Sequence, residues 1–363
     1  MRLATTLITS SSLMFLVGCA LENNPTPTTA EIESVSSVVQ LTTGFDRAGE
    51  AYFSSDMKWI IFQGAPPGEP QYQMYVAQVK SAGGQITGLG NPIRISPEQS
   101  RNTCGYFSPD GLSLIFASTA GKEDPDTPTA GYQRQGRDYR WSYPKGMEIY
   151  RADGWQGAVA AVEPGKIVDL AKHRLTENDA YDAEGSISPD GKSIVFTSNR
   201  TGDLELYAMR LDGTNQVQLT HTPGYDGGPF FSPDGKKILY RSDRKGNDLL
   251  QIYTADLTFD PSGAITGIAN ERQLTSNEAV NWGPYWYPTG SHIIYASSGT
   301  DHSNYDLWLM RADGSHKTRI TFDSNADVLP VFSPDGKYLI WASKRNGQTT
   351  QVYVARFVFP HGS

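Results

Sequence analysis

A six-fold repeat of a short turn motif constrains the fold of this chain more than any other feature. The motif Ser-Pro-Asp-Gly occurs four times, beginning at Ser108, Ser188, Ser232 and Ser333. Two degenerate copies, Ser54-Ser55-Asp56-Met57 and Tyr287-Pro288-Thr289-Gly290, complete the set. Counted at the third position, consecutive copies are separated by 54, 80, 44, 55 and 46 residues. Proline fixes φ and Asp-Gly tolerates positive φ, so each copy predicts a tight hairpin turn between two strands.

Each copy of the motif lies within the same longer pattern. A short apolar strand follows the turn, and a polar–aliphatic–aromatic triplet comes next, as in Glu205-Leu206-Tyr207. A triplet of a basic residue or Gln, an aliphatic residue and a hydroxyl residue ends the unit, as in Gln218-Leu219-Thr220. Four strands in a unit of roughly 45 residues are typical of one propeller blade. Since no segment has a sustained helical period, the sequence predicts an all-β, six-bladed β-propeller of four-stranded blades.

The hydroxyl-ending triplet is displaced in the last unit. No such triplet follows the final blade, but Gln40-Leu41-Thr42 stands before the first one. We therefore expect an N-terminal strand to complete the last blade and close the ring. A closed ring leaves no open sheet edge, which is the usual advantage of this arrangement.

The N-terminus resembles that of a bacterial lipoprotein. An apolar stretch, too short to span a membrane, follows Arg2 and ends in Leu16-Val17-Gly18-Cys19. This ending resembles a lipobox, which implies a signal peptide over 1–18 and a lipid on Cys19. An ordinary cleaved signal with an incidental cysteine is the alternative. Membrane anchoring through acyl chains on one cysteine is stable, because each buried methylene contributes about 0.8 kcal/mol.

The residues after Cys19 predict how the domain is presented. The polar, Pro/Thr-rich segment 19–37 lacks periodicity and is expected to be a flexible tether. The propeller is then expected over 38–358. Ala20, in place of the Asp that retains enterobacterial lipoproteins at the inner membrane, favours the outer membrane with the propeller on its periplasmic side.

The repeats resemble the propeller of the TolB-like family from Val38 to Arg356. The likeness is carried by the six turn motifs and by three segments that follow one pattern: Tyr181-Asp182-Ala183-Glu184, Tyr225-Asp226-Gly227-Gly228 and Asn281-Trp282-Gly283-Pro284. The resemblance implies a periplasmic propeller that binds another envelope protein. TolB itself carries an α/β domain before its propeller and is soluble, whereas this chain has a tether and a lipidation motif there.

Composition and missing motifs narrow the function. A formal charge of −8 without a basic run argues against nucleic acid as a partner. The sequence has no Gly-x-Ser-x-Gly, His-Glu-x-x-His, phosphate-binding glycine loop or Cys-x-x-Cys motif. We therefore expect a non-catalytic envelope lipoprotein whose propeller binds a protein or peptide. The alternative is a metal-dependent polysaccharide lyase or hydrolase that uses the propeller channel.

A ring of polar residues is expected on the face where the first strand of each blade begins, which we call the entry face. Five members lie six residues before the turn motifs: Asn102, Asp182, Asp226, Asn281 and Asp327. The first blade has Ala48 there, with Asp46 and Glu50 beside it, and Glu184 adds a further carboxylate. These oxygens could bind a divalent cation or a cationic peptide end. Alternatively, each side chain caps its own loop by accepting backbone N–H groups.

A long insertion between the second and third strands of the second blade, 119–146, is expected on the same face. It contains seven candidate partner-binding residues: Tyr132, Arg134, Arg137, Tyr139, Arg140, Trp141 and Tyr143. Long ordered loops are commonly functional, and Tyr, Trp and Arg are enriched at binding hot spots. The alternative is that these aromatic residues plug the channel or pack over the blade.

Two further features lie at the entry face. Arg200, Arg244 and Arg345 occupy equivalent loops, where they either face a bound anion or are solvated. Cys104 stands just before the first strand of the second blade, near the channel mouth. A buried, inert thiol and a nucleophile are the two interpretations of this cysteine.

Overall fold

The computed structural model of the chain describes residues 34–120, 131–135, 138–163, 165–299, 302–345, 347 and 349–360, with side chains given outside 131–142. The predicted signal peptide over 1–18 and the lipid attachment at Cys19 lie outside the described residues. Among the described residues, none of the helices is long and apolar enough to cross a membrane.

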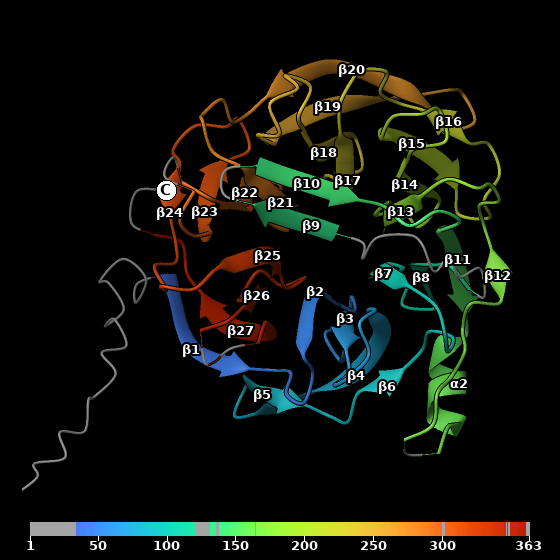
Figure 1. Cartoon of the computed structure of the whole chain (residues 1–363), viewed down its shortest axis with the longest axis vertical. Coiled ribbons are helices and arrows are strands. Elements are labelled where there is room, and N and C mark those ends of the chain that lie inside the picture. The colour runs from blue at the N-terminus through green and yellow to red at the C-terminus, as the bar shows by residue number, and fades with distance from the viewer. Residues whose placement is uncertain are drawn as a thin grey trace, which may run out of the picture.

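Six antiparallel sheets form a closed ring (Figure 1), as predicted. Blade 1 contains β2 (Arg47–Phe53), β3 (Trp59–Ala65), β4 (Gln73–Ala82), β5 (Gln85–Leu89) and β6 (Ile93–Arg94). Blade 2 contains β7 (Asn102–Phe107), β8 (Ser113–Ser118), β11 (Glu148–Asp153) and β12 (His173–Arg174). Blade 3 contains β13 (Asp182–Ile187), β14 (Ser193–Ser198), β15 (Glu205–Arg210) and β16 (Val217–Gln218).

The second half of the ring repeats the same order. Blade 4 contains β17 (Asp226–Phe231), β18 (Lys237–Ser242), β19 (Gln251–Phe259) and β20 (Ile265–Gln273). Blade 5 contains β21 (Asn281–Trp286), β22 (His292–Ser297), β23 (Asp306–Arg311) and β24 (Thr318–Arg319). Blade 6 contains β25 (Asp327–Phe332), β26 (Tyr338–Ser343), β27 (Gln351–Phe357) and β1 (Val35–Gln40).

The turn motif joins the first and second strands of every blade. In blade 3, Ser188 Oγ donates to Asp190 Oδ1 at 2.6 Å and accepts from the backbone N–H of Ser193 at 2.9 Å. Gly191 closes the turn at φ 72°, a conformation that costs an L-residue free energy. In the degenerate first copy, Met57 adopts the same left-handed conformation at φ 57°.

The predicted closure of the ring is confirmed. β1 pairs antiparallel with β27, and the N–H of Leu41 donates to the carbonyl of Val352 at 2.7 Å. Thr42 Oγ1 accepts from the N–H of Val352 at 2.9 Å, the bond that Thr220 makes with Leu206 inside blade 3. β1 begins at Val35, so residues 35–37, expected in the tether, are part of this strand.

Most of the core lies between blades, where the alternating apolar residues of neighbouring sheets meet. In blade 2 the link between β11 and β12 forms the short helix α2 (Trp155–Ala161), whose Trp155 is buried against Trp59 of blade 1 with ring centroids 5.3 Å apart. Contacts of this kind fix the angle between adjacent blades and hence the width of the channel.

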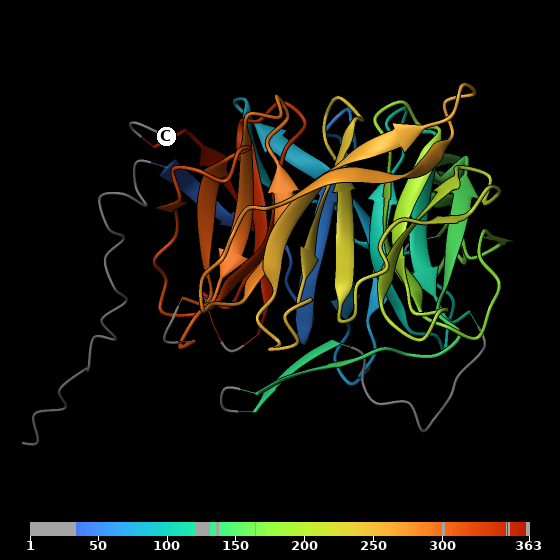
Figure 2. The same ribbon diagram turned by 90° about the horizontal axis from the view of Figure 1, so that it is seen from above.

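The two faces of the ring differ. The turn motifs lie on one face, and the first strands start at the entry face, as the pairing of Asn102 with Ser118 across β7 and β8 requires. The long insertion of blade 2 forms an antiparallel ribbon of β9 (Gly131–Gln135) and β10 (Asp138–Ser142). This ribbon lies outside the ring at the entry face and crosses the end of the channel (Figures 1 and 2).

Candidate binding cavity in the propeller channel

The first strand of every blade has a β-bulge at the same position along the strand. The register of β2, β7, β13, β17, β21 and β25 shifts four residues before the turn motif. The residue at this position has a left-handed backbone in all six blades: Glu50 (φ 46°), Cys104 (54°), Glu184 (56°), Gly228 (60°), Gly283 (56°) and Leu329 (53°). All six line one cavity. Such a backbone costs a residue other than Gly about 1–3 kcal/mol and is concentrated at functional sites.

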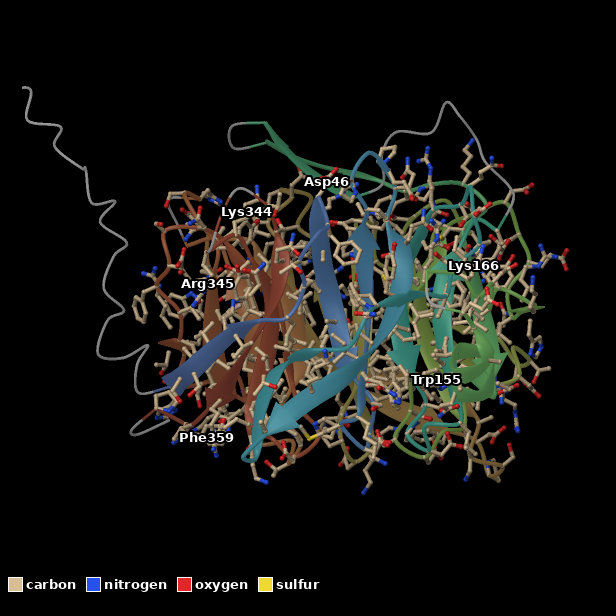
Figure 3. All side chains as sticks on the ribbon, turned by 90° about the horizontal axis from the view of Figure 1, so that it is seen from below. Asp46, Trp155, Lys166, Lys344, Arg345 and Phe359 are labelled. Atoms are coloured by element: carbon tan, nitrogen blue, oxygen red, sulfur yellow. The ribbon has the colours of Figure 1, made fainter. Side chains whose placement is uncertain are left out.

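The cavity measures about 550 Å³, within the usual size of a ligand pocket. One end is bounded by an aromatic cluster of Tyr52, Tyr106, Phe230 and Tyr285, with ring centroids 5.0 to 6.3 Å apart. At the other end the wall includes residues of the entry loops, among them Lys344. Figure 3 places Lys344 at the same end of the ring as the β9–β10 ribbon.

A buried ion pair forms part of the cavity wall. Arg241 Nη2 lies 3.1 Å from Glu184 Oε1, and the two side chains are 8% and 13% exposed. The other oxygen, Glu184 Oε2, accepts from Thr197 Oγ1 at 3.0 Å, Tyr225 Oη at 2.8 Å and Gly228 N at 2.6 Å. Both oxygens of this carboxylate are therefore engaged by neighbouring groups of the ring.

Aromatic rings enclose the guanidinium of the same pair. The Arg241 Cζ atom lies 5.4 Å from the ring centre of Tyr225 and 5.8 Å from that of Trp282. Burial acts to lower the pKa of Arg241, but the interactions with Tyr225 and with the carboxylate of Glu184 outweigh burial and raise it. The guanidinium is therefore a fixed positive charge in a partly dehydrated site.

Glu50 and Cys104 form a second polar group on the adjacent blades. Burial raises the pKa of Glu50 to about 7, and its hydrogen bonds with Cys104 and Tyr52 act in the opposite direction. Burial, followed by the charge of Glu50, raises the pKa of the Cys104 thiol well above its usual range. The structure thus favours the interpretation of Cys104 as a buried thiol that stays protonated at neutral pH, because nucleophilic cysteines have lowered pKa values.

Two hydrogen-bond donors in the wall are buried without an acceptor in the part of the chain that the structure describes. They are Arg241 Nε and Tyr143 Oη. Tyr143 packs against Tyr181 and Tyr225, with ring centroids 4.9 and 6.3 Å away. Buried polar atoms without a partner are uncommon and call for an explanation.

The structure separates the predicted polar ring from the cavity. Asp182, Asp226, Asn281 and Asp327 are fully buried and lie outside the cavity wall, whereas Asn102 borders it. Their partners belong to the blades: Asp327, for example, accepts from Trp341 Nε1 at 2.9 Å. This placement gives the ring a structural part within the blades, through side-chain donors in place of the backbone N–H groups that loop capping requires. Asp46 accepts from the N–H of Gly68 at 3.2 Å and also lies outside the wall.

The arginines of the entry loops pair with this ring. Ion pairs join Arg200 to Asp182 at 2.7 Å, Arg244 to Asp226 at 3.4 Å and Arg345 to Asp327 at 2.6 Å. Each arginine follows its aspartate by 18 residues, whereas the ring positions occupied by Asn have no arginine at that distance. These arginines are therefore partly buried and held in ion pairs within their own blades. The shared spacing is the sequence signal that identifies the pairs.

The described residues do not support a metal site at this ring. Among them, no group of three or more His, Cys, Asp or Glu side chains is arranged to hold a metal ion. Glu184, a carboxylate of the cavity wall, already has both oxygens occupied by Arg241 and by uncharged donors. Cation binding by the ring therefore stays a prediction, and no arrangement of ligands among the described residues supports it.

The structure describes only part of the predicted partner-binding loop. The side chains of Tyr132, Arg134, Tyr139, Arg140 and Trp141 fall in the ribbon, where only the backbone is described, and Arg137 lies outside the described residues. Tyr143 is described and lies in the cavity wall. The ribbon and the cavity are therefore adjacent parts of the entry face.

Sequence reasoning named Glu50, Cys104 and Glu184 without recognising that they share one position in the repeat, and it missed Arg241. Glu50, Cys104 and Glu184 all lie four residues before a turn motif, so aligning the six repeats at that position reveals the shared site. Arg241 has no such signal, because it is a single substitution in an apolar second strand and equivalent strands have Thr197 or Ala296 there.

Comparison with known proteins agrees with this architecture. A family model described as the TolB beta propeller domain matches residues 186–272. A TolB homologue from Chlorobium luteolum is 34% identical over 212 residues, which cover 57% of this chain and 44% of that protein. The Tol-Pal system protein TolB from Bordetella pertussis is 45% identical over 40 residues, 11% of this chain and 9% of that protein. The chain thus spans less than half the length of these relatives.

Solved structures share the fold at low sequence identity. A structure from Agrobacterium tumefaciens assigned to TolB has a TM-score of 0.54 and 19% identity, covering 86% of this chain and 91% of that chain. An oligogalacturonate lyase in complex with manganese has a TM-score of 0.51 and 16% identity, covering 90% and 95%. At such identities the likeness shows the fold alone. Together with the six repeats and the closed ring, these matches establish that the chain carries a TolB-like six-bladed β-propeller.

Proposed function

We propose that this protein is an envelope lipoprotein, anchored through Cys19 and facing the periplasm, whose propeller binds a protein or peptide at the entry face. The observation that carries the proposal is the cavity of about 550 Å³ bordered by the entry loops and crossed by the β9–β10 ribbon. Recognition sites of propellers are built from loops at one end of the ring, since the blades themselves are committed to packing.

The relatives support the same reading. One of them is named as a protein of the Tol-Pal system, which favours a partner in the envelope. The lyase in the structural comparison does not favour an enzyme here, because its similarity is confined to the fold.

Site-specific photo-crosslinking in the intact envelope tests the proposal. A crosslinker at Lys344, on the entry face, should capture one envelope protein, and a crosslinker at Asp313, in the turn between β23 and β24 on the opposite face, should not. Replacing 121–142 by a short Gly-Ser linker should abolish capture while the circular dichroism spectrum is retained.

A matched deletion controls for general damage. Shortening the β19–β20 hairpin across 260–263, which lies on the face opposite the ribbon (Figure 2), should leave capture intact. Equal crosslinking from both faces, or capture that survives removal of 121–142, would contradict binding at the entry face.

A further inference from the structure

We infer that the cavity binds a carboxylate group through Arg241 and Tyr143. This inference deepens the proposed function by naming the chemical group that the entry face receives. It rests on that function only for the source of the carboxylate, which is the end or an acidic side chain of a bound polypeptide.

The first argument is the pair of donors without acceptors. Arg241 gives one terminal nitrogen to Glu184, while its Nε and the hydroxyl of Tyr143 have no acceptor among the described residues. Leaving a buried donor without a partner costs about 1–3 kcal/mol. The oxygens of a ligand carboxylate would satisfy such donors, because each accepts several hydrogen bonds and the group pairs with a guanidinium.

The second argument is the charge of the wall. Four cationic side chains line the cavity, Arg47, Arg101, Arg241 and Lys344, against the two carboxylates Glu50 and Glu184. The chain as a whole has a formal charge of −8. A cationic lining in an acidic protein attracts anionic groups to this place on the surface.

Glu50 gives the site a dependence on pH. The titratable and charged groups that face Glu50 are Tyr52 of its own strand, Tyr72, Cys104, Glu184 and Arg241. Near neutral pH its carboxyl takes up or releases a proton, because burial raises its pKa to about 7. The protonated form places no charge beside an incoming carboxylate, whereas the ionised form repels it. Affinity for a carboxylate therefore falls as pH rises through this range.

Calorimetric titration of the full chain with succinate tests the inference. We expect saturable binding whose affinity falls about tenfold from about pH 6 to about pH 8, within the usual range of coupling between two sites. The Glu50→Gln variant should bind as tightly at the higher pH as at the lower one. The Tyr143→Phe and Arg241→Lys variants should each weaken binding at least about fivefold.

Matched variants show whether these effects belong to the cavity. Glu205→Gln removes another buried carboxyl whose pKa is raised by burial, and Tyr295→Phe removes a buried hydroxyl; both residues lie outside the cavity wall. Neither variant should change succinate binding or its pH dependence. If Arg241→Lys fails to fold, the isosteric Glu50→Gln and Tyr143→Phe variants still decide the question.

Binding of a cation in place of an anion would overturn the inference. If propylamine binds in place of succinate, with an affinity that rises with pH and is lost in Glu50→Gln, then the cavity is a cation site. Absence of succinate binding while the photo-crosslinked partner is still captured would also overturn it and leave the proposed function standing. Succinate binding without capture of any envelope protein would support the carboxylate site and contradict the proposed function.

Discussion

Arg345 donates to Asp327 at 2.6 Å in a pair that is almost wholly enclosed by blade 6. The Trp341 ring lies under the guanidinium at 5.0 Å, and its Nε1 donates to the same aspartate. Burial raises the pKa of Asp327 and the charge of Arg345 opposes that rise. The pair thus ties the entry loop of the blade to the start of its first strand.

Removing one member of this ion pair should destabilise the folded protein strongly. We expect Asp327→Ala to lower the free energy of unfolding by about 3–5 kcal/mol, because it leaves a buried guanidinium without its counter-charge. The double variant Asp327→Leu with Arg345→Met should lose much less. Urea denaturation of the single and double variants measures the coupling. Lys172→Met, which breaks an exposed ion pair with Asp169, should change stability by no more than about 1 kcal/mol.

The carboxyl of Glu50 should make the protein less stable as pH rises toward neutrality. Its pKa is raised to about 7 in the folded chain from 4.5, so the folded state holds a proton that the unfolded state has released. Its stabilising effect is complete below the unfolded pKa and is lost between about pH 4.5 and about pH 7. Glu50→Gln should remove this slope and be more stable than the wild type near pH 8 by about 2 kcal/mol. Denaturation at several pH values measures it, and parallel curves for the two proteins would contradict the assignment.

The contribution of ring closure to stability can be measured with substitutions at two threonines. Thr42→Val and Thr275→Val each remove a hydroxyl that accepts a buried backbone N–H, from Val352 at 2.9 Å and from Ile252 at 2.8 Å. Both should cost about 1–3 kcal/mol in global stability. Amide hydrogen exchange should differ, because Thr42 holds the two ends of the chain together: exchange in β1 and β27 should accelerate in Thr42→Val alone. Equal exchange patterns would mean that the closure adds nothing beyond an ordinary blade contact.

Gly228 should be intolerant of a side chain for a reason specific to the cavity. A Cβ at this position would lie 2.4 Å from Arg241 Nη1, and the backbone of Gly228 has a φ of 60°. Gly263 also has positive φ, at 80°, but a Cβ there would meet no atom within 4 Å. We expect Gly263→Ala to cost about 1 kcal/mol and Gly228→Ala clearly more, with loss of succinate binding in Gly228→Ala alone. Thermal denaturation and the calorimetric titration measure the two effects.

The number of blades and the closure of the ring were predictable because each is determined by residues that are close together in the sequence. A Ser-Pro-Asp-Gly turn is specified by its own four side chains and backbone, and the displaced Gln40-Leu41-Thr42 triplet can complete a single sheet. The boundary at Val38 was three residues late because the edge strand β1 has mostly exposed side chains between Val35 and Gln40 and therefore resembles a linker.

The contents of the channel were harder to predict because they depend on a bulge. A regular strand would alternate its side chains, whereas the extra residue in each first strand turns Glu50 and Glu184 into the channel and leaves Asp182 and Asp226 between the blades. Of the predicted ring, Glu50, Asn102 and Glu184 therefore line the cavity, whereas Asp182, Asp226, Asn281 and Asp327 are buried outside its wall. Arg241 comes from the next strand outward, so its contact with Glu184 depends on the angle between two blades.

The six bulges also place the lining of the channel at six equivalent positions of the ring. Each blade contributes one residue there whose backbone is held by its own strand pairing, and Glu, Cys, Glu, Gly, Gly and Leu occupy the six places in chain order. A change at one place alters the lining of the channel at that place. We therefore expect substitutions at these six places to change which ligand the cavity accepts, and comparison of related propellers at the same six places would test whether they sort by ligand.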